Sequence, residues 1–338
     1  MMMIPSTRNL KQLLQYTPWI FVYAILLTVY TINSKYYQTQ GIDQRIDMPS
    51  KYLNMLDGCY HVYLDVGSNL GVQVRKLMEP SKYPDANNTL RLFNFLFGDE
   101  TVRTQPMDGD DSYMCVVGFE PNSHLTQYLR EVESSYHKCG WRVKFLTETG
   151  VSDHYGTTQF YSDGELNKYE WGGGILPHKL ITVAKDNSTK EDGESSWAYQ
   201  TWLSMPKDHE KVDLVRLSDF LRFVVGSRRI PLKYKKSSHK PPRVAIKIDI
   251  EGSEVDVLPD LLFSGGLEFV NVLMIEWHSS LQLQEERKNA TILLKSILGA
   301  MSNYSTVMEE ELGRKHAFRL VNLDDETYGL TKYELPQC

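Results

Sequence analysis

Hydrophobic and polar positions are arranged along the chain in blocks that predict strands and helices in turn. Short runs rich in Val, Ile, Leu and aromatic residues predict strands, and apolar positions spaced by a helical turn predict helices. The predicted strands span 61–65, 113–120, 142–146, 157–161, 212–217, 244–250, 272–277, 305–308 and 316–321, and the predicted helices 72–78, 123–135, 219–225, 253–263 and 285–301. Near-continuous apolar strands separated by helices favour an α/β fold, with a parallel sheet covered by helices on both faces.

One apolar block, residues 13–32, differs from the others because it is long and carries no charged residue. About 20 apolar residues in a helix cross a bilayer, and Trp19 and Tyr30 suit its interfaces. The block predicts a transmembrane signal anchor. The expected partner is therefore a membrane, which the chain would enter through this anchor. A cleaved signal peptide is the alternative, but no convincing small-residue cleavage pair follows Ile32. The predicted organisation is a tail at 1–12, the anchor, a polar stem at 33–57 and a folded domain at 58–338.

Composition narrows the class of protein and its partners. Of the 338 residues, 41% are hydrophobic and 24% charged, which is typical of a globular protein with a sizeable core. The net charge of -6 gives no basic face for nucleic acid, so no nucleic-acid partner is expected. The oligomeric state stays open. The four cysteines, Cys59, Cys115, Cys139 and Cys338, lack metal-site spacing and can pair in three ways.

Four glycosylation sequons suggest the compartment. They begin at Asn87, Asn187, Asn289 and Asn303. Together with the anchor, they predict a single-pass membrane glycoprotein of the endoplasmic reticulum or Golgi with a lumenal catalytic domain. A cytosolic body is the alternative, because Arg8 and Lys11 before the anchor are matched by Lys35 and Arg45 after it.

The stretch from Tyr63 to Gly71 is the first candidate for chemistry. An apolar strand stops there in a turn containing Gly67 and Gly71, and a helical pattern follows. Glycines let a backbone approach a ligand closely, and the start of a helix offers free N–H groups. The stretch therefore predicts a nucleotide cradle.

Acidic residues also stand where the predicted strands end. In parallel sheets, ligands bind at the carboxyl ends of the strands. A carboxylate at the end of the second strand is suited to hold the two hydroxyls of a ribose. The acids at strand ends are Asp65, Glu120, Glu148, Asp249 and Glu276.

Several motifs, in order, resemble one known family, the FkbM-type S-adenosylmethionine-dependent methyltransferases. The matching segments are 64–71, 118–122, 150–160, 217–221, 246–258 and 275–278, and the Lys-x-Asp-x-Glu-Gly run that starts at Lys247 is the most specific. The resemblance extends from about Tyr60 to Ser279. It implies a class I methyltransferase fold, a Rossmann-like sheet of about seven strands that binds S-adenosyl-L-methionine over its first two strand ends.

The resemblance also implies which residues bind this cofactor. The methionine end would contact the first turn, the ribose would contact the second strand end, and the adenine would lie near the stretch after Leu146. The cofactor-binding residues are Asp65, Gly67, Ser68, Asn69, Gly71, Glu120, Pro121 and Asn122.

Methyl transfer from a sulfonium is a direct displacement, so a hydroxyl acceptor requires alignment and a base. Asp249 and His278 are the candidates for the base, with Glu251 and Glu276 as orienting carboxylates. A metal ion bridging these carboxylates is an open alternative, but their spacing has no metal-binding signature and no metal ligand is assigned.

Three inserts lengthen the predicted domain, near 80–111, 162–211 and 226–243. The first and the basic third should emerge at the amino-terminal edge of the sheet as surface features. The second contains Trp171, Trp197, Tyr199 and Trp202; it either covers the carboxyl edge as an acceptor pocket or packs against the body.

The predicted function is O-methylation of a glycan, lipid or other small-molecule hydroxyl. Two alternatives remain. One is a membrane-anchored glycosyltransferase using Asp108 and Asp110, whose acidic run ends at Asp111. The other is a non-catalytic scaffold that binds the cofactor.

Overall fold

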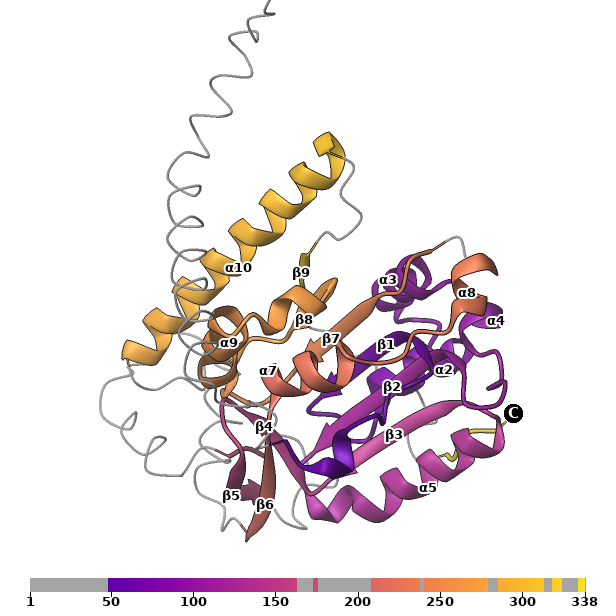
Figure 1. Ribbon diagram of the computed structural model, residues 1–338. Coiled ribbons are helices and arrows are strands. Elements are labelled where there is room, and N and C mark those ends of the chain that lie inside the picture. Colours follow the sequence, from indigo (N-terminus) through magenta and orange to yellow (C-terminus); the bar gives the residue numbers. More distant parts are fainter. Residues whose placement is uncertain are drawn as a thin grey trace, which may run out of the picture.

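The computed structural model describes residues 48–162, 173–175, 208–237, 240–278, 285–312, 318–323 and 334–337. They form an α/β fold of the Rossmann-like type, built on a six-stranded central sheet (Figure 1). Every neighbouring pair in this sheet is parallel, in the order β3-β2-β1-β7-β8-β9. The strands are β1 (Cys59–Val66), β2 (Ser112–Glu120), β3 (Arg142–Thr147), β7 (Val244–Ile248), β8 (Val272–Ile275) and β9 (Arg319–Asn322).

Helices cover both faces of this sheet, as the apolar strands predict. Alternate residues of each strand point to opposite faces, so Tyr63 and Leu64 belong to two different core clusters. One cluster lies under α2 (Val72–Met78), α3 (Asn87–Phe97) and α5 (Thr126–Lys138). The other lies under α7 (Leu217–Phe220), a π-helix (Leu221–Val225), α9 (Glu254–Phe263) and α10 (Glu285–Leu312). Shorter helices are η1 (Ser50–Tyr52), η2 (Pro80–Lys82), α4 (Glu100–Arg103), η3 (Ser123–Leu125), α8 (Leu232–Ser237) and η8 (Gly266–Phe269).

A small second sheet continues from the central one. It contains β4 (Thr149–Ser152), β6 (Asp208–Arg216) and β5 (Gly156–Ser162), in that order. Glu148, with φ of +55°, makes the turn from β3 into β4. The predicted strands at 157–161 and 212–217 thus form a sheet of their own (Figure 1).

The carboxyl-terminal part differs from the sequence expectation. Residues 305–308, predicted as a strand, lie within the 28-residue helix α10. The run is too short to break a helix, and three glutamates, good helix formers, follow it. The described sheet therefore has six strands where about seven were expected, and β9 is the closing strand.

The insert at 80–111 is not simply a surface feature. Its helix α3 buries Phe93, Leu96 and Phe97 completely, and the Phe93 ring meets the Tyr63 ring edge-on, with centroids 5.3 Å apart. The Arg103 side chain is also buried and donates to the carbonyl of Leu77. This insert completes the cover of one sheet face.

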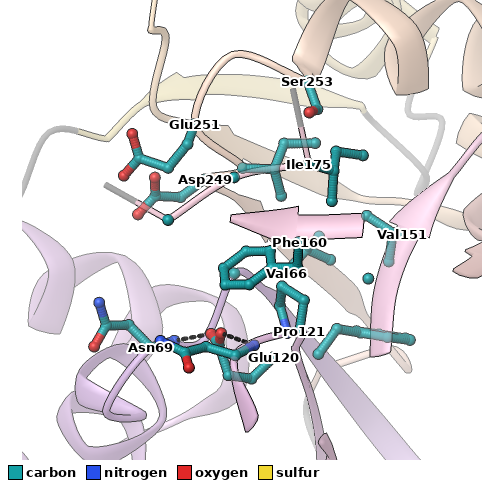
Figure 2. A pocket seen from close by; sticks show the side chains of 17 residues that line it. Val66, Asn69, Glu120, Pro121, Val151, Phe160, Ile175, Asp249, Glu251 and Ser253 are labelled. Carbon is teal, nitrogen blue, oxygen red and sulfur yellow. Dashed lines mark hydrogen bonds between the residues drawn. The ribbon is translucent and has the colours of Figure 1, made fainter. Parts of the chain in front are cut away.

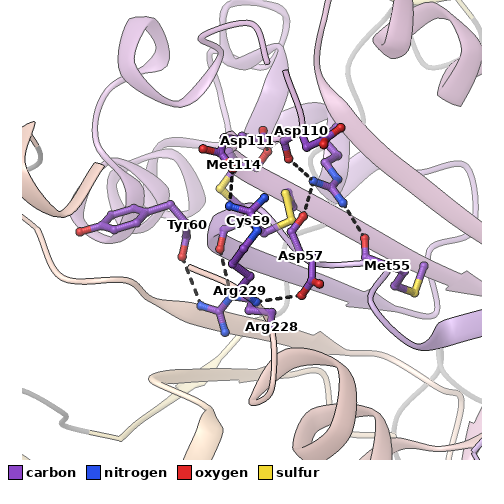
Figure 3. The surroundings of a disulfide bond; sticks show 12 residues. Met55, Asp57, Cys59, Tyr60, Asp110, Asp111, Met114, Arg228 and Arg229 are labelled. Atoms are coloured by element: carbon purple, nitrogen blue, oxygen red, sulfur yellow. Dashed lines mark hydrogen bonds and ion pairs between the residues drawn. A yellow bond between two sulfur atoms is a disulfide. The ribbon is translucent and has the colours of Figure 1, made fainter. Parts of the chain in front are cut away.

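The insert at 226–243 packs against the amino-terminal edge of β1 (Figure 3). Arg228 donates to the carbonyls of Cys59 and Tyr60, and the Arg229 backbone N–H donates to Asp57. A disulfide joins Cys59 to Cys115 on the neighbouring strand. This bond selects one of the three possible pairings, and Cys139 is also disulfide-bonded.

The segment before β1 is part of the folded body. Met48, Tyr52 and Leu56 are buried in the core, although the sequence places them in the stem. The body therefore begins before the predicted boundary at residue 58. None of the helices within the described ranges combines the length and hydropathy needed to span a membrane, and the predicted anchor at 13–32 lies outside those ranges.

Candidate functional site

A pocket opens at the carboxyl ends of β1, β2 and β7 (Figure 2). The strand order reverses between β1 and β7, and such switch points are where open α/β sheets bind ligands. The small sheet and the segment 173–175 close the other side. The lining residues are Val66, Gly67, Asn69, Phe119, Glu120, Pro121, Asn122, Gly150, Val151, Phe160, Gly173, Gly174, Ile175, Asp249, Ile250, Glu251 and Ser253.

The turn after β1 is held by the protein itself. The N–H groups of Gly67 and Ser68 donate to the carbonyl of Phe119, and that of Asn69 donates to the Glu120 carboxylate. These backbone N–H groups are thus already bound within the protein and are not free to contact a nucleotide. Gly67 has φ of +81°, and a Cβ there would stand 1.8 Å from the Asp249 carbonyl oxygen. The glycine is needed for close contact with the backbone after β7.

Glu120 is a buried carboxylate at the end of β2. Its two oxygens accept hydrogen bonds from the backbone N–H groups of Asn69 at 2.6 Å and Asn122 at 2.8 Å. Burial raises the pKa of Glu120 to about 7 even though these two bonds lower it, and the charges of Asp65 and Asp249 raise it further. Since each carboxylate oxygen has two lone pairs, Glu120 can still accept two hydroxyl groups.

Behind the pocket, a buried lysine lies between two aspartates. Asp65 on β1 is in register with Lys247 on β7, and the Lys247 ammonium is 2.5 Å from Asp249 Oδ2. Burial raises the pKa of Asp65 to about 6, although the positive charge of Lys247 lowers it. For Asp249, burial raises the pKa, but the charges of Lys247 and His278 outweigh it and lower the pKa. Asp65 Oδ2 is buried without a hydrogen-bond partner.

His278 is surrounded by carboxylates from three elements. Its Nδ1 is 2.8 Å from Glu254 Oε1, at the start of α9. Its Nε2 faces oxygens of Asp249, Glu251 and Glu276 at 3.5, 3.6 and 3.7 Å. Burial lowers the pKa of His278, but the Glu254 bond and the surrounding charges outweigh it and raise the pKa to about 10.

Glu251 stands in the turn between β7 and α9, with φ of +51°. It lines the pocket, and its side chain is 28% exposed. Burial raises its pKa to about 7, although the charge of His278 lowers it.

The structure brings most of the predicted site residues to this edge. Gly67, Asn69, Glu120, Pro121, Asn122, Asp249 and Glu251 line the pocket, whereas Asp65, Ser68 and Gly71 are not among its lining residues. The Ser68 hydroxyl donates to the Asp65 carbonyl, and Gly71, at φ of +70°, packs against Phe145. Glu276 and His278 adjoin Asp249. Glu148, the remaining acid at a strand end, is not among the lining residues; its carboxylate accepts a hydrogen bond from the Thr126 hydroxyl.

Three further residues of the candidate site were not assigned a role from the sequence. Lys247 and Glu254 fall within the quoted motif, and a lysine inside a buried strand two residues before an aspartate could have indicated the ion pair. Ser253 also lines the pocket; its hydroxyl is buried and has no hydrogen-bond partner.

The second insert reaches the pocket. Residues 173–175 contribute to its lining, and Gly174 pairs with Tyr161 of β5. The aromatic residues Trp171, Trp197, Tyr199 and Trp202 lie outside the described residues.

The acidic run of the glycosyltransferase alternative lies at the opposite edge, just before β2. Asp108 is 2.7 Å from Lys233, and Asp111 is 2.8 Å from Arg229. Asp108 and Asp111 are therefore already paired with cations of the third insert.

Comparison with known families gives one match. Residues 107–319, more than half of the chain, match the family described as the methyltransferase FkbM domain. The matched region contains Glu120, Asp249, Glu251 and His278 and begins after the turn at Gly67. The comparisons with curated proteins and with solved structures returned no match.

Proposed function

The chain belongs to the FkbM methyltransferase family, and from this premise we propose that it transfers the methyl group of S-adenosylmethionine to a hydroxyl acceptor. The observation that carries the donor assignment is Glu120. A buried carboxylate at the second strand end, held by two backbone N–H groups, is suited to accept the two ribose hydroxyls.

Other features of the pocket fit this donor. Phe160, Pro121, Val151 and Ile175 offer apolar surface for the adenine ring. Asn69 Oδ1 is buried without a hydrogen-bond partner in the protein. Because buried polar atoms are normally hydrogen-bonded, this atom indicates a bound ligand. The carboxylate of Asp249 gives the far side of the pocket a negative charge, which favours a cationic sulfonium.

S-adenosylmethionine supplies an electrophilic methyl group, and no covalent enzyme intermediate is needed. The protein has to orient the acceptor oxygen and receive its proton. Asp249 and Glu251 are the two carboxylates that line the pocket. Because Asp249 Oδ2 is bound to Lys247, we assign Glu251 as the base, with Asp249 orienting the acceptor. We do not assign His278, the other predicted base, to this role, because its contact with Glu254 and a pKa of about 10 favour the protonated ring.

Calorimetric titration of the purified full-length protein tests the donor assignment. S-adenosylmethionine is expected to bind with a stoichiometry of one, and a uridine diphosphate sugar is expected not to bind. Binding of the sugar nucleotide instead, or of neither compound, would refute the assignment.

Donor affinity is expected to rise with pH between about 6 and 8. Glu120 has a pKa of about 7, so it carries a proton in much of the protein at pH 6. Hydroxyl donors favour the ionised carboxylate, and binding then releases that proton. The dissociation constant should fall by up to about tenfold per pH unit below pH 7 and level off above pH 8. Titrations at several pH values measure it, and Glu120→Gln should flatten the profile; an equally steep profile in this variant would assign the effect to another group.

We further propose that the domain works in an oxidising, glycosylating compartment. A disulfide between β1 and β2 is typical of such compartments. The asparagines of three sequons, Asn87, Asn289 and Asn303, are exposed. There, a glycan or a lipid is the proposed class of acceptor.

Glycosidase digestion of the protein expressed in eukaryotic cells checks the compartment. The electrophoretic mobility is expected to increase after digestion, and Asn87→Gln should remove part of the shift. Unchanged mobility with all four sequons intact would contradict a lumenal domain.

A further inference from the structure

The ends of β7 and β8 bring a histidine and two carboxylates together beside the pocket. Ligand atoms of Asp249, Glu276 and His278 all lie within 4.8 Å of one another. His278 Nε2 stands 3.5 Å from Asp249 Oδ1 and 3.7 Å from Glu276 Oε1, which is too long for good hydrogen bonds. Ligands bound at about 2.1 Å to a tetrahedral metal stand about 3.4 Å apart. We propose that these three residues form a binding site for one divalent cation.

The histidine is oriented as a metal ligand is. Its Nδ1 is held at 2.8 Å by Glu254, whose side chain is 2% exposed and which belongs to α9. A carboxylate on one ring nitrogen fixes the ring and leaves the other nitrogen to the metal, an arrangement found in most histidine metal sites. Nε2 is therefore the ligand atom, and it faces the carboxylates of the two strand ends.

The charge of this region is unbalanced. Four carboxyl groups, from Asp249, Glu251, Glu254 and Glu276, surround His278, and Lys247 contacts the cluster through Asp249. Carboxylate oxygens of Asp249 and Glu276 also lie within 4.8 Å of each other. Two ionised carboxylates this close repel unless positive charge lies between them. A divalent cation that displaces the Nε2 proton of His278 adds positive charge between them.

A second observation points to a ligand in the adjoining pocket. Ser253, 1% exposed, lines the pocket together with Asp249 and Glu251, and its hydroxyl has no hydrogen-bond partner in the protein. A molecule bound to the cation from the pocket side would come within reach of this hydroxyl.

The role of the cation rests on the proposed function. One nitrogen and two oxygen ligands suit Mn²⁺ or Zn²⁺ and leave coordination positions open. An acceptor hydroxyl bound at an open position loses its proton more readily. Its oxygen forms the bond to the methyl carbon, the bond from that carbon to sulfur breaks, and the proton passes to Glu251. Acceptors with two neighbouring oxygens, such as vicinal diols, fit best because both oxygens can bind the cation.

Titration of the full-length protein with Mn²⁺, after removal of metals with a chelator, tests the site. We expect one Mn²⁺ per chain, seen by calorimetry and by loss of the free-ion electron paramagnetic resonance signal. His278→Ala and Glu276→Gln should each weaken binding by at least about tenfold. The matched control is Asp108→Asn, in the acidic run at the opposite edge, which should leave the affinity unchanged.

The outcomes separate this inference from the proposed function. No Mn²⁺ binding, or binding that Asp108→Asn removes and His278→Ala leaves intact, overturns the cation site even if S-adenosylmethionine binds. Mn²⁺ binding without S-adenosylmethionine binding supports the site and refutes the donor assignment. Glu276→Gln preserves shape, so its result decides if His278→Ala does not fold.

Discussion

Replacing Glu120 by alanine is expected to weaken S-adenosylmethionine binding about 100-fold. The change removes the two carboxylate oxygens that accept from the ribose in the proposed complex, and charge-assisted hydrogen bonds contribute about 1.5–3 kcal/mol each. It also leaves the N–H groups of Asn69 and Asn122 without their acceptor, so the turns after β1 and β2 lose their connection. Calorimetric titration of the wild-type and variant proteins measures the effect.

The control for this prediction is Glu131→Ala, an exposed glutamate on α5 away from the pocket. It should bind the donor as the wild type does. Thermal unfolding without donor shows whether Glu120→Ala is folded, and Glu120→Gln, which keeps one acceptor oxygen, should lose less affinity. A donor affinity in Glu120→Ala within about threefold of wild type would remove Glu120 from the donor site.

The second large effect is expected from Glu251→Gln, which should lower kcat by about 100- to 1,000-fold. Glutamine has the same shape but cannot take the acceptor proton. The dissociation constant of the donor should change little, because Glu251 lies on the acceptor side of the pocket. Transfer of a radiolabelled methyl group to an acceptor identified from a glycan and lipid panel measures the rate.

Glu148→Gln is the matched control, because Glu148 is also a glutamate with positive φ, at +55°, but bonds to Thr126 outside the pocket. Its rate should stay close to that of the wild type. If Glu251→Gln keeps wild-type kcat, the proton passes to another group, and the base assignment fails.

The sequence predicted the central sheet well because its strands are buried on both faces. Val244 to Ile248 and Val272 to Ile275 are almost entirely apolar, and such runs leave little choice of structure. The run at 305–308 was misassigned because a short β-branched segment inside a long helix has the same local pattern as a strand. Packing of α10 against the sheet decides between helix and strand, and a local sequence pattern carries no information about that packing.

The sequence predicted the site residues that stand at the ends of strands. It was less informative about which residues from different elements come together. Glu120, Asp249 and Glu251 follow from the position of each strand end. The cluster around His278 unites residues from β7, α9 and the end of β8, and its spacing along the chain has no motif. The burial of α3 was not predicted for a similar reason, because Phe93 packs against Tyr63, which lies thirty residues away in the sequence.

The contact between Gly67 and the Asp249 carbonyl has a consequence for how the reacting groups are spaced. The two turns touch through backbone atoms, and the Asp249 N–H also donates to the Val66 carbonyl. Neither turn can slide past the other without breaking the edge of the sheet. The distance between the proposed donor side and the proposed acceptor side of the pocket is thus fixed by two adjacent strands of the sheet.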